Sequence, residues 1–240
     1  MAKYLLALKD RQEVAKDTMA FWFDTLGSGY TFRAGQHAHF ILVDPPETDG
    51  EGYGRTLSFA TSPNNQGSFM VATRMRDTAF KRALRAIPVG TRVKVSAPMG
   101  SFTLHRDSSK PAVFLAGGIG VTPISSIVNW ATEERLPHNL YLFYSNRTPE
   151  ETAFMDRFEN WMRLNPNLKF IPTVTASRNG SWGGEFGRID REMLVKYVPE
   201  IQGPFYYLAG PPGMVAAMRQ LLDDMGVSED SIKTEEFAGY

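Results

Sequence analysis

Cysteine is absent from all 240 residues of the sequence. Its absence excludes disulfide bonds, a thiolate nucleophile, cysteine-ligated zinc and any iron–sulfur cluster held by thiolates of this chain. Any redox chemistry must therefore use a cofactor that other groups of the chain hold.

The sequence also lacks an excess of charge of either sign and any long hydrophobic run. Lys and Arg total 26, as do Asp and Glu, so the formal net charge at pH 7 is zero. This balance argues against nucleic acid or an anionic membrane surface as the main partner. No run approaches the roughly 18 apolar residues of a membrane span, and the N-terminal segment lacks the features of a secretory signal. We expect a globular protein that resides in the cytoplasm.

Two patterns of hydrophobic residues divide the chain. Up to residue 107, short alternating or β-branched runs are broken by Gly, Pro, Asn and Asp, which predicts an antiparallel β-barrel with one helix at residues 79–87. From residue 111 onward, strand-like runs alternate with amphipathic helical ones, the pattern of an α/β parallel sheet with helices on both faces. We therefore predict two domains, residues 1–107 and 111–240.

Two turns rich in glycine and proline follow apolar strands in the second half. GGIGVTP begins at Gly117 and AGPPGM begins at Ala209. Ligands bind beyond the carboxyl ends of parallel strands, where glycine permits close approach and a helix N-terminus attracts phosphate. Tight turns and close packing also require glycine, so two such turns are a stronger signal than one. The third glycine of the usual dinucleotide fingerprint is missing, and Pro123 stands near its position.

Two features of the first half present groups that could meet a ligand, a basic strand and a helix start. The first is RTLS, where strand alternation places Arg55 and Leu57 on one face and Thr56 and Ser58 on the other. The second is the start of the predicted helix after Thr78, whose hydroxyl suits an N-cap and whose following N–H groups would face an anion. A solvated strand-end charge and a solvated basic helix face are the alternative interpretations.

Four motifs, in this order, resemble the ferredoxin–NADP reductase superfamily over nearly the whole chain. They are RTLS, GGIGVTPISSI, AGPPGM and the C-terminal EEFAGY at residues 235–240. The resemblance implies a flavin-binding barrel, with FAD the expected flavin, followed by a domain that binds NADPH or NADH.

The resemblance assigns roles to residues of the barrel. Arg55 would pair with the flavin phosphate, Leu57 would cover the ring and Ser58 would reach its reactive nitrogen edge. The residues assigned to the flavin are Arg55, Thr56, Leu57, Ser58, Thr73, Arg74, Thr78, Ala79, Phe80 and Lys81. Leu57 replaces the usual aromatic residue, which removes ring stacking, and Lys81 replaces a serine, which changes the type of phosphate partner.

The resemblance also lays the nicotinamide nucleotide across the glycine turns. The residues assigned there are Gly117, Gly118, Gly120, Thr122, Gly210, Pro211, Pro212 and Met214. Ala209 replaces a cysteine of many relatives, which leaves hydride transfer in place because the flavin and nicotinamide perform it. Arg147, Thr175 and Arg178 could take a 2′-phosphate, which favours NADPH over NADH without deciding between them.

Aromatic residues near the C-terminus would lie beside the flavin, where the nicotinamide must stack. Phe237 is the first candidate for a ring that must be displaced, and Tyr240 is the second. Glu235 or Glu236 would supply a polar contact near the ring. Ser58, Glu235 and Phe237 are the predicted catalytic residues. The alternative is that Phe237 simply packs in a groove between the domains.

The resemblance therefore implies a flavin-dependent NAD(P)H oxidoreductase that passes electrons to a separate acceptor such as a ferredoxin, a flavodoxin or an oxygenase component. A free-flavin or quinone reductase and a non-catalytic electron-transfer or regulatory subunit are the alternatives. We expect no nucleic-acid partner and no membrane span. His37 and His39 share a strand face, but no third ligand recurs nearby, so we predict no metal site.

Overall fold

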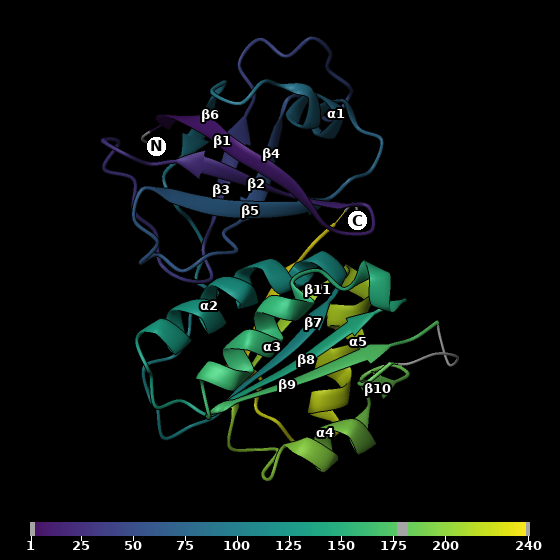
Figure 1. Ribbon diagram of the computed structural model, residues 1–240. Helices are drawn as coiled ribbons and strands as arrows, with labels where there is room; N and C mark the ends of the chain where they lie inside the picture. Colours follow the sequence, from purple (N-terminus) through teal and green to yellow (C-terminus); the bar gives the residue numbers. More distant parts are fainter. Residues whose placement is uncertain (1–2, 177–181, 239–240) are drawn as a thin grey trace.

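The computed structural model describes residues 3–176 and 182–238 of the chain. Arg178 and Tyr240, both assigned above to cofactor binding, lie outside the described residues. The described strands form two sheets of six strands each, and Figure 1 shows one sheet above the other. The predicted fold class, an antiparallel barrel followed by a parallel α/β sheet, is confirmed.

The first sheet is antiparallel and curls into a barrel. It contains β1 (Lys3–Ala15), β2 (Thr18–Asp24), β3 (His37–Ile41), β4 (Gly54–Ser58), β5 (Ser68–Arg74) and β6 (Arg92–Ser96). The strand order is β4-β3-β6-β1-β2-β5, and a bridge between Phe59 and Val71 joins the two end strands. Alternate side chains point inward, and Phe21, Phe40 and Phe69 fill the interior. Helix α1 (Ala79–Ala86) packs its apolar face into the same core.

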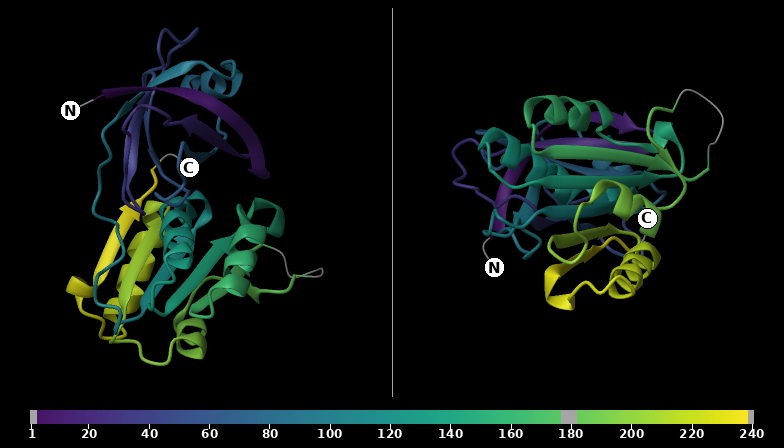
Figure 2. Two further views of the ribbon diagram at one scale, coloured as in Figure 1. Left: turned by 60° about the vertical axis from the view of Figure 1, so that its left-hand side comes forward. Right: turned by 90° about the horizontal axis from the view of Figure 1, so that it is seen from below.

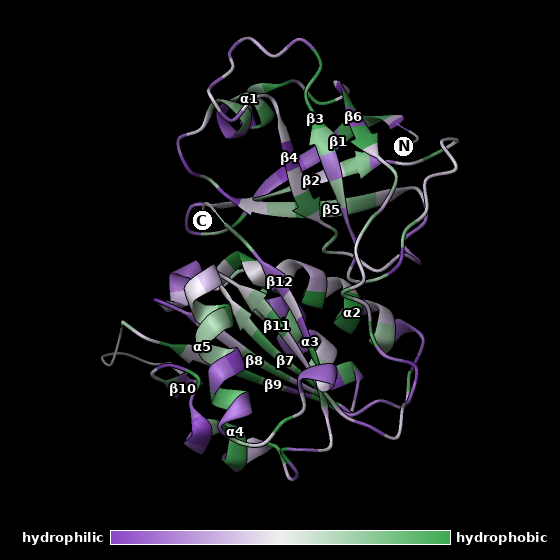
Figure 3. Cartoon of the chain, turned by 180° about the vertical axis from the view of Figure 1, so that it is seen from behind, coloured by the Kyte–Doolittle hydropathy of each residue, from purple (hydrophilic) through white to green (hydrophobic). Residues whose placement is uncertain are grey.

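The second sheet is parallel and buried on both faces. It contains β7 (Ala112–Gly117), β8 (Leu140–Asn146), β9 (Leu168–Val174), β10 (Glu185–Phe186), β11 (Phe205–Gly210) and β12 (Ile232–Glu236). The strand order is β10-β9-β8-β7-β11-β12. The helices are α2 (Val121–Glu133), α3 (Met155–Leu164), α4 (Arg191–Tyr197) and α5 (Pro212–Asp223). Every residue of the central strand β7 is buried, and Figure 3 shows hydrophobic strands between more polar helix surfaces.

Side chains that alternate along these strands pack against different helices. Phe114 and Leu142 join the cluster that includes buried residues of α2 and α3. Val113 and Phe143 join the cluster that includes buried residues of α4 and α5. Helices therefore cover both faces of the sheet, as the sequence predicts.

Helix α2 fixes the barrel on the parallel sheet. Ser125 Oγ donates a hydrogen bond to the Ala60 carbonyl at 2.8 Å, and Ser126 Oγ donates one to the Thr61 carbonyl at 2.6 Å. Figure 2 shows the end of β12, near the C-terminus, rising towards the barrel. The end of β4 thus faces the carboxyl ends of the parallel strands. Among the residues that the structure describes, none of the helices combines the length and apolar character needed to span a bilayer.

Candidate functional site

The two glycine turns pack directly against each other at one edge of the parallel sheet. They follow β7 and β11, which are neighbouring strands. A Cβ at Gly117 would overlap the Met214 sulfur, and a Cβ at Gly120 would overlap the Ala209 backbone. Gly120 therefore requires glycine, because backbone atoms block its Cβ, whereas at Gly117 the obstacle is the flexible Met214 side chain. Close packing is one of the alternatives that the sequence left open.

Gly118 differs because it lies on the open side of the turn. Its φ is +52°, and a Cβ there would meet no atom within 4 Å. The turn Gly118–Gly120 leads into α2 at Val121. Thr122 is buried, and its hydroxyl donates to the Ile119 carbonyl at 3.0 Å, so its contact with a nucleotide stays a prediction. Gly118 is the position where a ligand can approach the backbone closely.

The turn after β11 leads into α5 and faces solvent. Pro211 is the N-cap residue, and residues 211–213 are exposed. Pro211 and Pro212 carry no N–H, and the Met214 and Val215 N–H groups donate to the Pro211 carbonyl at 2.9 and 3.1 Å. Gly213 therefore carries the first N–H of this helix that could meet an anion.

A hydroxyl and a carboxylate meet between the two sheets. Ser58 Oγ, at the end of β4, donates a hydrogen bond of 2.7 Å to Glu235 Oε1 on β12. Glu235 pairs in register with Ala209, so this contact adjoins the second glycine turn. The structure thus brings together two residues that the sequence predicts to be catalytic. Their catalytic roles stay predictions.

His37 is a third member of this cluster. Its Nδ1 lies 3.6 Å from Glu235 Oε1, and His37 pairs with Ser58 across β3 and β4. The same nitrogen is buried and makes no hydrogen bond to the part of the chain that the structure describes. His39 instead faces Thr56, with 3.4 Å between Nδ1 and Oγ1. Within residues 3–176 and 182–238, no group of three or more His, Cys, Asp or Glu side chains is placed to hold a metal ion.

Phe237 lies at the end of β12 beside the second glycine turn. Its backbone N–H donates to the Gly210 carbonyl at 3.0 Å. Its ring is partly buried and packs against the core cluster that contains α2. This packing agrees with the alternative that Phe237 packs in a groove between the domains. Displacement of the ring by a nicotinamide stays a prediction.

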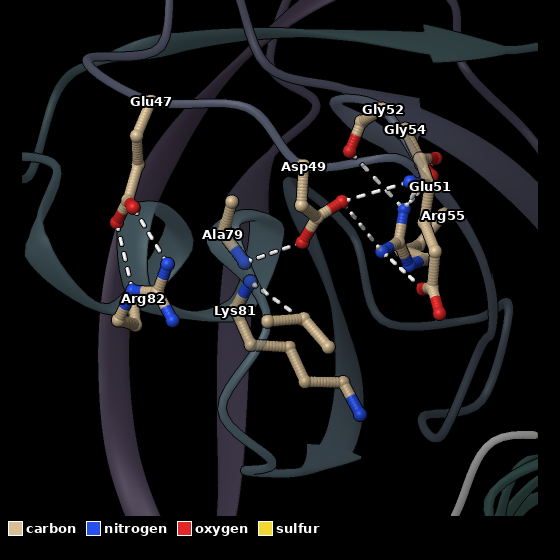
Figure 4. Close-up of polar contacts among 10 residues, drawn as sticks. Glu47, Asp49, Glu51, Gly52, Gly54, Arg55, Ala79, Lys81 and Arg82 are labelled. Carbon is tan, nitrogen blue, oxygen red and sulfur yellow. Dashed lines mark hydrogen bonds and ion pairs between the residues drawn. The ribbon is translucent and has the colours of Figure 1, made fainter.

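The two candidate phosphate features of the barrel form one site (Figure 4). Thr78 caps α1 by accepting a hydrogen bond from the Lys81 N–H at 3.4 Å. The Arg55 guanidinium lies over the Phe80 ring, 5.4 Å from its centroid. Burial, together with the charges of Arg76 and Arg55, lowers the pKa of Lys81 to about 8. Basic side chains therefore surround the first turn of α1.

An internal carboxylate occupies this basic site. Asp49 Oδ2 accepts a hydrogen bond of 2.7 Å from the Ala79 N–H, and Oδ1 lies 3.8 Å from Arg55 Nη2. The hydrogen bond from Ala79 is the main reason that the pKa of Asp49 is held below its usual range. Glu51 Oε2 accepts a 2.6 Å hydrogen bond from Arg55. The sequence interpretation missed both acidic residues, whose only signal was an acidic loop immediately before the RTLS motif.

Other residues assigned to the flavin lie apart from this basic site or are buried. Leu57 is 3% exposed and packs in the barrel interior, which argues against a role as a stacking surface for a flavin ring. Thr73 is fully buried within β5. Arg74 forms an ion pair of 2.6 Å with Glu151 of the second half, so it joins the two halves.

The residues assigned to a 2′-phosphate lie at neighbouring strand ends. Arg147 directly follows β8, Thr175 directly follows β9, and both are exposed. Thr175 Oγ1 donates to the Asn146 carbonyl at 3.3 Å, and the Ala176 N–H donates to the Arg147 carbonyl at 2.8 Å. The structure therefore places these two candidate contacts side by side.

Protein-family models match the barrel half and the parallel-sheet half of the chain separately. The oxidoreductase FAD-binding domain family matches residues 5–104, and the oxidoreductase NAD-binding domain family matches residues 114–220. Fold and site together thus define a two-domain protein of the class that binds FAD and a nicotinamide nucleotide. The chain thus contains an oxidoreductase FAD-binding domain followed by an oxidoreductase NAD-binding domain.

Curated relatives have low sequence identity to this chain but match most of its length. The reductase component of propane 2-monooxygenase from Rhodococcus jostii is 27% identical over 217 residues, which cover 88% of this chain and 56% of the relative. Ferredoxin–NADP reductase B from Sorangium cellulosum is 27% identical over 220 residues, which cover 88% of this chain and 87% of the relative. The chain thus spans little more than half the length of the first of these two relatives.

Solved structures share the fold over almost the whole chain. A ferredoxin–NADP reductase from Neisseria gonorrhoeae with bound FAD and NADP has a TM-score of 0.79 and 20% identity, and 98% of each chain is covered. A cytochrome P450 reductase from Amycolatopsis has a TM-score of 0.84 and 22% identity, with 98% of this chain and 70% of that chain covered.

Proposed function

We propose that this chain is an NAD(P)H-dependent flavoprotein reductase that passes electrons through FAD to a separate acceptor. The contact between Ser58 and Glu235 carries this proposal, because it joins the end of the barrel strand β4 to the strand beside the glycine turns. A flavin ring beside Ser58 and a nicotinamide beside Gly118 would meet where the two halves face each other.

The described residues fit both ligands. At the barrel, the Asp49 carboxylate stands in for a phosphate by accepting the Ala79 N–H next to Arg55. Arg55, the start of α1 at Thr78 to Lys81, and Ser58 would hold the flavin. At the sheet edge, Gly118 leaves its outer side open. Gly118 and the exposed start of α5 would hold the nucleotide.

Bound FAD would supply the hydride acceptor and the relay to a one-electron acceptor. The chain itself provides orientation and electrostatics. Glu235 accepts the Ser58 hydrogen bond and thereby fixes the hydroxyl at the end of β4. Phe237, hydrogen-bonded through its backbone to Gly210, would cover the same region when no nucleotide is bound.

Several finer assignments belong to the same proposal. The flavin-binding part comprises residues 1–107 and the nucleotide-binding part residues 111–240. Arg147 and Thr175 would recognise the 2′-phosphate of NADPH, and their exposure at adjacent strand ends supports this. We place the reaction in the cytoplasm, where reduced nicotinamide nucleotides are available.

The acceptor is proposed from the relatives. The names of matched proteins include reductase components of propane 2-monooxygenase and terephthalate 1,2-dioxygenase, and ferredoxin–NADP reductase B. These names support a ferredoxin, a flavodoxin or an oxygenase component as the partner that accepts electrons.

Turnover with different acceptors tests the function. Purified protein with added FAD and NADPH or NADH should reduce a ferredoxin, flavodoxin or oxygenase component faster than it reduces free FMN, free riboflavin or a quinone. Faster turnover of free flavin or quinone would favour the alternative reductases. Absence of turnover with every acceptor, despite a bound flavin, would favour a non-catalytic subunit.

A further inference from the structure

The loop between β3 and β4 turns acidic side chains towards α1 and Arg55 (Figure 4). We call residues 47–51 of this loop, ETDGE, the acidic strap. Asp49 binds the Ala79 N–H at 2.7 Å, and Glu51 binds Arg55 Nη2 at 2.6 Å. The strap therefore lies across the basic site around the first turn of α1.

The other donor nitrogen of Arg55 bonds to the last residue of the strap and to carbonyls of the chain just after it. Arg55 Nη1 donates to the carbonyls of Glu51, Gly52 and Gly54 at 3.0, 3.3 and 2.8 Å. These contacts direct the guanidinium into the loop. A phosphate that paired with Arg55 in a fork-like geometry would have to take over donors that the strap now uses.

An ion pair anchors the start of the strap to α1. Arg82 donates to Glu47 through Nε at 2.8 Å and through Nη2 at 2.6 Å. The strap is thus held at Glu47 on the helix surface and at Asp49 on the helix N-terminus. Glu47 accepts from Arg82 and Asp49 accepts from Ala79, so release of Asp49 breaks neither bond of the Glu47 anchor.

We propose that the acidic strap is a built-in competitor for the flavin phosphate. It closes the phosphate site in the flavin-free protein and must release Ala79 and Arg55 before flavin binds. This inference rests on the proposed assignment of the flavin phosphate to Arg55 and the start of α1. Because a carboxylate and a phosphate cannot share the same donors, and because like charges repel, the closed strap and bound flavin exclude each other.

The competition has a consequence for flavin affinity. A site that is open for only a fraction of the time binds its ligand with an apparent Kd raised by the inverse of that fraction. Weakening the closed strap should therefore tighten flavin binding. The same change should destabilise the flavin-free protein, because it weakens a contact at the start of α1. These opposite effects distinguish a competitor from a residue that merely supports the site.

The test compares Asp49→Asn with Asp44→Asn in flavin-stripped, full-length protein. Asp44 lies in the same loop, is exposed, and has a φ of +46°, a conformation that asparagine tolerates. Asp49→Asn keeps the side-chain shape and removes the charge. We expect it to lower the Kd for FAD by roughly fivefold or more and to lower the Tm of the flavin-free protein. Asp44→Asn should change neither.

Arg55→Ala separates failure of this inference from failure of the proposed site. If Arg55→Ala weakens FAD binding and Asp49→Asn also weakens it or leaves it unchanged, the site is correct and the competitor is wrong. If Arg55→Ala leaves FAD binding unchanged, the phosphate site itself is wrongly assigned and the inference falls with it.

A unique label reports movement of the strap. The sequence contains no cysteine, and a Cβ at Gly50 would meet no atom within 4 Å, so Gly50→Cys gives a single labelling site in the strap. Leu26→Cys, at a side chain that is 74% exposed on the barrel, is the control. Addition of FAD should change the emission of an environment-sensitive dye at position 50 and not at position 26. An unchanged signal at position 50 when FAD saturates the site would overturn the proposal.

Discussion

Glycine has two distinct roles within one turn. Gly120 has no room for a Cβ because backbone atoms at the end of β11 pack on it, and a Cβ at Gly117 would displace the Met214 side chain. Gly118 has room and a left-handed backbone. The sequence could identify the three glycines as a group, but it could not show which of them are needed for packing and which lies on the open side of the turn. The packing partners, Met214 and Ala209, lie far along the chain.

Alanine substitutions should separate these roles. Gly120→Ala forces a methyl group against the Ala209 backbone, so the free energy of unfolding should fall by about 1–3 kcal/mol. Gly118→Ala should cost only about 1 kcal/mol of backbone strain, but its methyl group points to the proposed nucleotide side. The Kd for NADPH should therefore rise about tenfold, with an unchanged flavin spectrum.

Urea unfolding and nucleotide titration of the flavin-loaded variants measure these two effects. A native nucleotide Kd in Gly118→Ala would show that this glycine, too, serves only the fold. Native stability of Gly120→Ala would contradict the packing role.

Arg147 tests the preference between the two nucleotides. Arg147→Ala should raise the KM for NADPH roughly three- to tenfold, a modest effect because the side chain is exposed. The KM for NADH should stay within about twofold, because NADH carries no 2′-phosphate for the arginine to bind. Steady-state kinetics of wild type and Arg147→Ala with both nucleotides measure these KM values. Equal changes for the two nucleotides would remove Arg147 from the phosphate site.

At the scale of elements, a cluster of aromatic and histidine rings packs around the segment that connects the two sheets. His105 Nδ1 lies 3.0 Å from the Tyr207 hydroxyl, and His138 Nε2 lies 3.0 Å from the His105 carbonyl oxygen. Burial is the largest influence on both histidines and lowers their pKa values. The fold therefore favours the neutral imidazoles.

This cluster should make stability depend on pH. Because the folded pKa values lie below the unfolded value of about 6.5, the unfolded chain binds more protons as the pH falls through that value. The free energy of unfolding should therefore be lower at pH 5.5 than at pH 7.5. Replacing His105 and His138 together by glutamine should reduce this difference, measured by urea unfolding. An identical pH dependence in wild type and the double variant would exclude the cluster as its source.

The end of β12 offers a second test at the scale of elements. Removing residues 237–240 deletes the Phe237 ring, which packs beside the second glycine turn. If the ring covers the nicotinamide position, the truncated protein should bind NADPH more tightly and reduce its flavin at a different rate. Rapid kinetics on flavin-loaded protein provide both values. Loss of stability alone, with native binding and native rate per folded molecule, would show that the segment only packs.

Regular elements were predictable from the sequence, whereas edge strands and loop contacts were not. The apolar period of residues 79–87 and the cap at Thr78 predicted α1, which spans Ala79–Ala86. The short strand β10 and the partly exposed strand β12 were missed because neither has a continuous apolar run. Secondary-structure propensity and hydrophobic periodicity describe local structure. They cannot reveal which distant strand an edge strand pairs with.

The candidate site was predictable in its parts and not in its assembly. The motifs identified Arg55, Ser58, the glycine turns and Glu235. The hydrogen bond between Ser58 and Glu235 joins residues separated by 177 positions, so only the fold could reveal it. The contacts of Asp49 with Ala79 and Arg55 depend on the conformation of a loop, which no hydrophobic periodicity in the sequence predicts.

In the whole molecule, function depends on how the two halves are held. Ser125 and Ser126 of α2 bond to backbone carbonyls just after β4, and Arg74 pairs with Glu151. These contacts hold the end of β4 over the glycine turns without any covalent crosslink, since the chain has no cysteine. The flavin side and the nucleotide side would therefore meet without a large closing movement.

Reduction of the bound flavin by a nicotinamide nucleotide tests the central claim most directly. Purified protein loaded with FAD is mixed with NADPH or NADH without oxygen, and the visible absorbance of the oxidised flavin is followed. We predict that this absorbance is lost, that it returns when an electron acceptor is added, and that Gly118→Ala slows the loss at a given nucleotide concentration. A protein that takes up no flavin, or whose bound flavin stays oxidised with both nucleotides, would contradict the account.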